Sequence, residues 1–247
     1  MKIISLNTWG GRIKEPLESF LTNNSDVDIF CFQEVYSNAD GKDTIWTNGT
    51  NLDLYADIKN ILPQHHTLFH PHLGDWWGLA LCVKKDIRLI AEGEVYVHKE
   101  NGWNTELEVI GHTAKNVQYI TFEKEHKKIT VCNFHGLWNG QGKNDTEDRI
   151  NQSKKIASFL KTLNTEIILC GDFNLAPDTE SLLLIEKELS LRNLVKDFAI
   201  TSTRTSYYTK DGKFADYMLV SSGVNVKDFK VLPDEVSDHA PLYLEIE

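Results

Sequence analysis

The chain has 247 residues, of which 41% are hydrophobic and 25% are charged, and its formal net charge at pH 7 is −10. This composition can build a sizeable core, so neither metals nor disulfides are needed merely to fold the chain. The acidic balance argues against a dedicated duplex-binding protein, which usually carries a basic face. The sequence contains no apolar run of about 20 residues, so we expect no membrane span.

Strand-like apolar runs recur along the chain and predict a β-rich fold. In chain order they are Lys2–Asn7, Asp28–Glu34, Leu79–Lys85, Arg88–Val97, Val117–Glu123, Lys128–His135, Glu166–Asp172, Asp216–Ser221, Asn225–Leu232 and Pro241–Ile246. Helical spacing is found at 15–22, 51–62 and 145–163, and again from Asp178, as a cap, to about Leu189. Because strands and helices interleave but several strands follow one another directly, we expect mixed sheets. No linker or repeat divides the sequence, which predicts one domain over 1–247.

The N-terminal sequence and the cysteines indicate the compartment. A strand pattern begins at MKIISLN and leaves no room for a signal peptide, so we expect either a cytoplasmic protein or a mature chain whose signal has been removed. The four cysteines lie in apolar runs and form no C-x-x-C pair, which favours reduced core residues over disulfides or a zinc site. We therefore expect a cytoplasmic protein and treat it as a monomer.

Long polar stretches at 37–50, 99–105, 136–146 and 201–213 carry aromatic residues that could form a binding surface. These residues are Trp46, Trp103, Trp138, Tyr207 and Tyr208. The histidine-rich segment HHTLFHPH has a strand-like alternation, and we expect surface or cleft-wall histidines there rather than metal ligands. Its histidines are His65, His66, His70 and His72.

Polar side chains stand at the ends or starts of several predicted strands, where a buried group without partners would cost roughly 2–7 kcal/mol. They are Asn7, Glu34, His135, Asp172 with Asn174, Asp216, and Asp238 with His239. Gathered at one edge, their oxygens suit Mg²⁺, and the two histidines would face an anion bound there. A metal, a base carboxylate and imidazoles around an anion indicate phosphoester hydrolysis.

Each of these residues also has a purely structural interpretation. Asp172 and Asp238 are common turn or cap residues, Asn7 could satisfy a loop backbone, and His135 could be a hydrogen-bonded core histidine. Their occurrence together and in order favours the functional interpretation.

The motifs LNTWG, QEV, NFHG, GDFN, ADYMLVS and SDHAPL resemble the successive signatures of the endonuclease/exonuclease/phosphatase superfamily, as in its uncharacterised bacterial members. The resemblance runs from Asn7 to His239. It implies a deoxyribonuclease I-like fold, a four-layer α/β sandwich of two mixed sheets packed face to face with helices outside. It also implies that Glu34 is the principal Mg²⁺ ligand, with Asn7 beside it and Asp238 at the metal or its water shell.

The resemblance further implies catalytic roles for five residues. Asp172 would position or deprotonate the attacking water, and Asn174 would orient groups around the phosphate. His239 would contact the phosphate while Asp216 holds its imidazole, and His135 would stabilise the phosphate or assist the leaving group. From the residues themselves, we expect Asp216 to raise the pKa of His239 and to keep it cationic.

Two positions depart from the family pattern. A second glutamate that orients the histidine at the His135 position in some nucleases is missing, and only Asp75 lies nearby in sequence. An arginine often found shortly before the Asp216 position is replaced by Lys213.

The sequence therefore predicts a Mg²⁺-dependent phosphoester hydrolase, with Mn²⁺ as a substitute ion, and most simply a phosphodiesterase. The substrate would be a small molecule. The alternatives are a DNA or RNA nuclease, including an abasic-site enzyme, and a non-catalytic binding module on the same scaffold.

Overall fold

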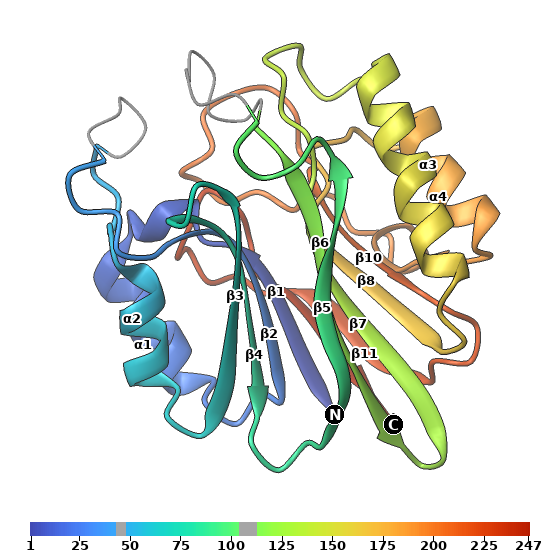
Figure 1. Cartoon of the computed structure of the whole chain (residues 1–247), viewed down its shortest axis with the longest axis horizontal. Coiled ribbons are helices and arrows are strands. Elements are labelled where there is room, and N and C mark those ends of the chain that lie inside the picture. Colours follow the sequence, from blue (N-terminus) through green and yellow to red (C-terminus); the bar gives the residue numbers. More distant parts are fainter. Residues whose placement is uncertain (43–47, 104–112) are drawn as a thin grey trace.

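Two six-stranded β-sheets pack face to face in the computed structural model, which describes residues 1–42, 48–103 and 113–247 (Figure 1). The strand order of the first sheet is β11 (Val226–Val231), β12 (Leu242–Ile246), β1 (Lys2–Asn7), β2 (Ile29–Tyr36), β4 (Trp77–Lys84) and β3 (His65–Leu73). The order of the second is β5 (Leu89–His98), β6 (Lys115–Lys124), β7 (Lys127–His135), β8 (Glu166–Asp172), β10 (Asp216–Val220) and β9 (Arg192–Asn193).

Helices cover the outer faces of both sheets (Figure 1). Helices α1 (Lys14–Asn23) and α2 (Leu54–Ile61) place apolar side chains on the first sheet, and α3 (Glu147–Lys161) and α4 (Glu180–Glu188) do the same on the second. The short helices η1 (Trp9–Gly11) and α5 (Leu194–Asp197) lie in connections. The predicted four-layer sandwich of two mixed sheets is confirmed.

The apolar runs of the sequence form the core because their residues are buried between the sheets and beneath the helices. Ile3, Cys31 and Leu81 from the first sheet and Val131 and Ile168 from the second are all fully buried in one cluster. The cysteines are buried and free, as expected; they are Cys31, Cys82, Cys132 and Cys170. No helix in the described ranges is long and apolar enough to cross a membrane.

One parallel strand pair lies near the middle of each sheet, β1 with β2 and β7 with β8. Parallel neighbours end at the same edge of a sheet, and β1 packs against β8, so the carboxyl ends of the two pairs meet. Gly171 permits the close pairing of β7 and β8: its φ is 141°, and an added Cβ would lie 1.9 Å from the Phe134 carbonyl oxygen. This glycine directly precedes Asp172.

The predicted elements agree with the structure within a few residues, and the differences have local causes. The histidine-rich segment is a complete edge strand, β3, paired with β4 along its length. Asp178 is not the cap of α4; instead, the Asp145 carboxylate accepts hydrogen bonds from the backbone N–H groups of Glu180 (2.7 Å) and Ser181 (2.9 Å). That cap comes from a distant loop, so the local sequence does not contain it.

Candidate active site

Three neighbouring strands of the second sheet place candidate residues side by side. His135 is paired in register with Asp172, and Asp172 with Asp216, so the ends of β7 and β8 and the start of β10 form one row. All three residues are buried, with at most 3% of each exposed. The strand register therefore brings together residues that are distant in sequence.

Glu34 reaches the same place from the first sheet. The pairing of β2 with β4 shifts register between Phe32 and Val35, and Glu34 has a φ of 57°. Such an irregularity re-aims a side chain out of the strand alternation, and a positive φ is an uncommon backbone conformation for a non-glycine residue. The chain is thus locally strained at the glutamate that the sequence singles out.

Asn7 joins the two sheets through its amide. Its Nδ2 donates hydrogen bonds to Glu34 Oε1 (3.0 Å) and to Asp172 Oδ2 (3.0 Å), while its Oδ1 accepts from the backbone N–H of Trp9 (2.9 Å). The Trp9 N–H fixes which end of the amide faces the carboxylates, because a flipped amide would set two donors against each other. In this arrangement Asn7 orients Glu34 and Asp172.

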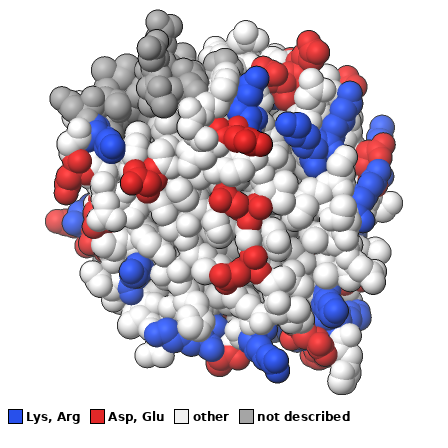
Figure 2. Space-filling view, in the orientation of Figure 1, with Lys and Arg blue, Asp and Glu red and all other residues white. Residues whose placement is uncertain are grey.

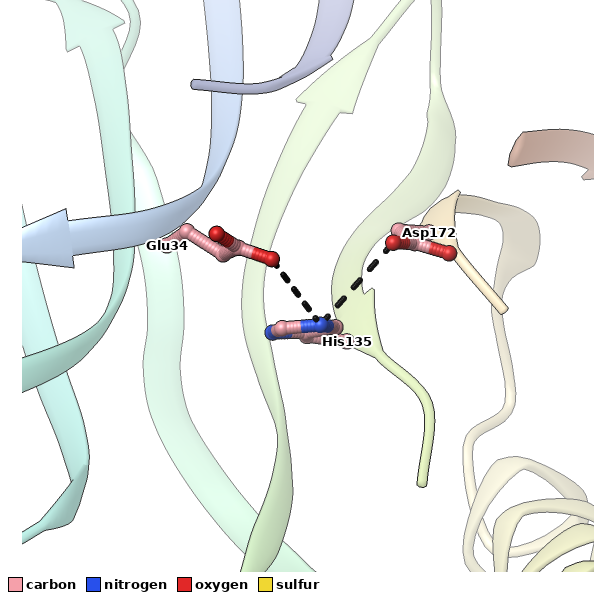
Figure 3. A group of neighbouring side chains, drawn as sticks. All are labelled: Glu34, His135 and Asp172. Carbon is pink, nitrogen blue, oxygen red and sulfur yellow. Dashed lines mark ion pairs between the residues drawn. The ribbon is translucent and has the colours of Figure 1, made fainter. Parts of the chain in front are cut away.

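Glu34 and Asp172 flank the imidazole of His135, as Figure 3 shows. His135 Nε2 lies 3.8 Å from Glu34 Oε1 and 3.9 Å from Asp172 Oδ2. Ligand atoms of these three residues lie within 4.8 Å of one another, as do those of Asp172, Asp216 and His239. The described residues therefore include a donor set that a divalent cation could occupy, with Asp172 common to both groups.

Burial sets the electrostatics of these groups. It raises the pKa of Glu34 to about 7, with a further rise from the neighbouring charges of Asp238 and Asp172. Burial, together with the nearby Lys115 ammonium, lowers the pKa of His135 well below its usual value. The site thus combines a carboxyl group that is hard to ionise with a histidine that is neutral at pH 7. A bound cation would lower the pKa of Glu34 and so favour its ionised form.

His239 and Asp216 form the predicted pair. His239 Nδ1 lies 2.8 and 2.9 Å from the two Asp216 oxygens, and Thr203 Oγ1 donates to Asp216 Oδ2 at 3.0 Å. However, burial and the Arg204 charge lower the pKa of His239 to about 4, and burial raises that of Asp216 to about 6. The expectation that Asp216 keeps His239 cationic is therefore wrong: burial and the Arg204 charge outweigh the attraction of the nearby carboxylates of Asp238 and Asp172.

The remaining predicted residues also reach the site. Asp172 Oδ1 accepts from the backbone N–H of Asn174 (2.8 Å), whose Nδ2 donates to the Gly136 carbonyl (3.2 Å) and whose φ is 53°. Asp238 Oδ1 lies 3.8 Å from His239 Nε2 and has no hydrogen-bond partner among the described residues. Except for Asn7 and Asp216, which lie behind it, the predicted site residues line one cleft of about 210 Å³.

The structure resolves both departures from the family pattern. Asp75 is exposed and does not replace the missing glutamate. Lys213 is also exposed, whereas Arg204 supplies a guanidinium in the cleft, with Nη1 3.4 Å from Asp238 Oδ2. Arg204 lies before Lys213 in the same long loop, and its position in the sequence gave no signal of this role.

Two further cations were not foreseen. Lys143 lines the cleft, and Lys115 is fully buried beneath it, with its Nζ 4.9 Å from the centre of the Trp77 ring and without a hydrogen-bond partner in the described part of the chain. An isolated lysine in a strand or loop carries no periodicity that would mark it.

The aromatic residues predicted to form a binding surface lie in different places. Trp138 and Tyr208 line the cleft, Trp103 lies in a separate surface hollow beside Lys155, and Trp46 lies outside the described residues. Tyr207 is 41% exposed.

The expectation of surface or cleft-wall histidines is wrong for two members of the segment. His65 is buried and its Nε2 contacts the Val27 carbonyl at 2.8 Å; His72 is buried with its Nδ1 3.1 Å from Asn116 Oδ1. In the described ranges, neither belongs to a metal-binding group.

Comparison with protein-family models finds a match to the endonuclease/exonuclease/phosphatase family over residues 4–239. The chain belongs to this family. Members are enzymes that hydrolyse phosphoester bonds, so this endonuclease/exonuclease/phosphatase domain is a hydrolase of that class. Comparison with curated proteins finds no match.

Solved structures share the fold of this endonuclease/exonuclease/phosphatase domain at low sequence identity. A mannosyl-6-phosphatase of Bacteroides thetaiotaomicron is 18% identical with a TM-score of 0.75, covering 100% of this chain and 99% of its own. ANGEL2, a 2′,3′-cyclic phosphatase, is 13% identical with a TM-score of 0.73, over 99% of this chain and 94% of its own. The human nocturnin catalytic domain with bound sulfate is 17% identical with a TM-score of 0.66, over 100% and 94%.

Proposed function

We propose that the protein hydrolyses a small phosphate ester with the help of a divalent cation, Mg²⁺ or Mn²⁺. The observation that carries this proposal is the meeting of Glu34 from one sheet with His135, Asp172 and the Asp216–His239 pair from the other. A carboxylate, a base and two imidazoles then surround a single small space.

The residues present fit a hard cation. Carboxylate oxygens are the ligands that Mg²⁺ prefers, and Asp238 Oδ1 is buried without a partner. The raised pKa of Glu34 also indicates a place where added positive charge would be stabilising. We propose Glu34 as the principal ligand, with Asp238 at the ion or its water shell and Asn7 as the residue that orients Glu34. When bound, such an ion polarises a phosphoryl oxygen and offsets charge on the leaving oxygen.

The chain's own residues would position the reactants. Asp172 is held by Asn7 and by the Asn174 backbone, so that its carboxylate is oriented to accept a proton from water. His239, neutral at pH 7 and fixed by Asp216, keeps Nε2 directed toward Asp172 at 3.6 Å. His135 and Asn174 would donate hydrogen bonds to phosphate oxygens in the transition state.

The decisive experiment compares Glu34→Gln with Asp75→Asn in the presence and absence of chelator. Both changes remove one acidic charge, but Asp75 is exposed and outside the cleft. We expect Glu34→Gln to lose several orders of magnitude in rate while folding normally, and Asp75→Asn to keep its rate. Chelator should abolish the activity of the wild type, and added Mg²⁺ or Mn²⁺ should restore it; full wild-type activity in chelator would exclude the metal-assisted mechanism.

Sequence reasoning favoured a phosphodiester over a monoester and kept nucleic acid as an alternative. On the face in Figure 2, basic side chains lie mostly around the margin among acidic ones rather than in a continuous basic surface. This face offers no continuous basic surface for the many phosphate contacts on which affinity for duplex DNA depends, and the cleft volume of about 210 Å³ supports a small substrate. A cytoplasmic location and a monomeric state are also part of the proposal.

A further inference from the structure

One wall of the cleft carries two cations that share an aromatic ring. The Arg204 guanidinium carbon lies 4.1 Å from the centre of the Tyr208 ring, and Lys143 Nζ lies 5.2 Å from it. All three residues line the same cleft as Asp172 and His239. We call Lys143, Arg204 and Tyr208 the cationic wall.

The cationic wall is held in place by the fold. Arg149, buried on α3, donates through Nε to the Leu137 carbonyl (3.2 Å) and through Nη1 and Nη2 to the carbonyls of Asn144 (2.5 Å) and Gly142 (2.6 Å). These bonds fix the loop that carries Lys143. Lys143 Nζ in turn donates to the Phe214 carbonyl at 2.8 Å. The Lys143 ammonium is therefore held at the cleft by hydrogen bonds of its own and of its loop, unlike the ammonium of a surface lysine that rotates freely.

The charges of the wall are only partly compensated. The Arg204 side chain is 7% exposed and contacts Asp238, but its Nε has no hydrogen-bond partner among the described residues. Burial and the charge of Arg204 lower the pKa of Lys143 to about 8. Holding two like charges over one ring is unfavourable unless an anion lies between them.

The cleft as a whole carries excess positive charge once a cation is bound. Its lining includes four basic residues, Arg12, Lys143, Arg204 and Lys210, against three carboxylates. A divalent ion brings this net charge to +3.

The size of the cleft favours a small substrate. Its volume of about 210 Å³ is smaller than that of the pockets of about 300–1,000 Å³ that hold drug-sized ligands.

We infer that the cationic wall binds the second negative charge of a phosphate monoester, so that the substrate is a small phosphomonoester dianion rather than a diester. This inference rests on the proposed function and narrows its small phosphate ester to a monoester, in place of the phosphodiester that the sequence favoured. The position beside Asp238 and His239 suits the non-bridging oxygens of the phosphate that reacts. Water forms the new P–O bond, the P–O bond to the alcohol breaks, and the proton that Asp172 accepts goes to the alcohol product.

The test uses p-nitrophenyl phosphate and bis-p-nitrophenyl phosphate, which share a leaving group, at pH 7.5 with saturating Mg²⁺. We expect the wild type to prefer the monoester. Lys143→Met should lower kcat/KM for the monoester about ten- to hundredfold, as expected for a lost charge-assisted hydrogen bond, and lower the monoester-to-diester ratio at least about tenfold. Inhibition by inorganic phosphate should weaken in parallel, and Lys143→Arg should restore most of the ratio.

The matched control is Lys154→Met, which removes the same charge from an exposed position on α3 outside the cleft. It should leave both rates unchanged. A wild-type preference for the diester, or an equal loss on both esters in Lys143→Met, would overturn the inference while leaving the proposed function standing. If the wild type hydrolyses neither ester with Mg²⁺ or Mn²⁺, the proposed function itself is contradicted. The wild-type preference needs no variant, so the test holds even if Lys143→Met does not fold.

Discussion

Replacing Lys115 by Met should make the protein more stable. Lys115 is fully buried on β6, and its ammonium has the Trp77 ring and the charges of Glu34 and Asp172 for compensation. This compensation is incomplete, because burial lowers its pKa from 10.5 to about 8. That difference corresponds to about 3 kcal/mol of unfavourable free energy for the charged form. Methionine has a similar shape and no charge to desolvate.

The stability that Lys115→Met gains over the wild type should decrease as the pH rises. Below pH 8 the lysine is protonated in both folded and unfolded chains, so the wild type bears the full cost. Between pH 8 and 10.5 the folded lysine releases its proton while the unfolded one keeps it, and the cost disappears. Lys115→Met should therefore be more stable than the wild type by about 2–3 kcal/mol at pH 7 and by little near pH 10.5.

Urea denaturation in chelator at pH 7 and at pH 10 measures this difference, with the exposed Lys154→Met as the control for a lost lysine charge. A variant no more stable than the wild type at pH 7 would show that the ammonium is fully compensated and that the reasoning from burial is wrong. The same change should cost activity: without Lys115, the pKa of Glu34 rises further, and the acid limb of the pH–rate profile should shift upward.

Other predictions test the site and its support. In chelator, the protein should lose stability as the pH rises from about 4.5 to 7, because the raised pKa of Glu34 makes the folded state bind its proton more tightly; the stabilisation by Mg²⁺ in thermal unfolding should grow over the same interval. Asp216→Asn should lower kcat and alter the pH–rate profile, because an uncharged amide with one acceptor oxygen holds the His239 tautomer less firmly than the carboxylate does; an unchanged profile would make Asp216 only a structural residue. Gly171→Ala should cost about 2–3 kcal/mol in chemical denaturation, since its Cβ would clash with the Phe134 carbonyl. Nicking of plasmid DNA, if present, should be weak and show a shallow dependence on salt; efficient nicking that collapses steeply between 20 and 300 mM, roughly the range over which counterion release acts, would favour a nuclease.

The sequence predicted well that His135, Asp172 and Asp216 lie together, because the signal at each strand end is local. Each strand that ends at the site shows an apolar run followed by a polar residue, as in the segments that end at Glu34 and Asp172. The register that places His135 beside Asp172 then follows from the parallel pairing of their strands.

Other features depend on tertiary contacts that no window of sequence contains. Arg204 reaches the cleft only because its loop pairs with His239, and Lys115 is buried only because the first sheet, with Trp77 of β4, closes over it. The pKa of His239 was misjudged for the same reason: its partner Asp216 is visible in the sequence, but the depth of burial that outweighs it is not. The sequence can name the partners of a titratable group, whereas its desolvation depends on the depth at which the fold buries it.

The position of β12 has a consequence for how the protein is made. Residues 242–246 pair with β1 on one side and with β11 on the other, so β12 joins the edge strand β11 to the rest of the first sheet. Asp238 and His239 directly precede it. While the chain is being synthesised, the edge of β1 that pairs with β12 stays unpaired until residues 242–246 have left the ribosome. Assembly of the cleft therefore waits until β12 has been synthesised, and a nascent chain shortened before residue 242 should remain inactive.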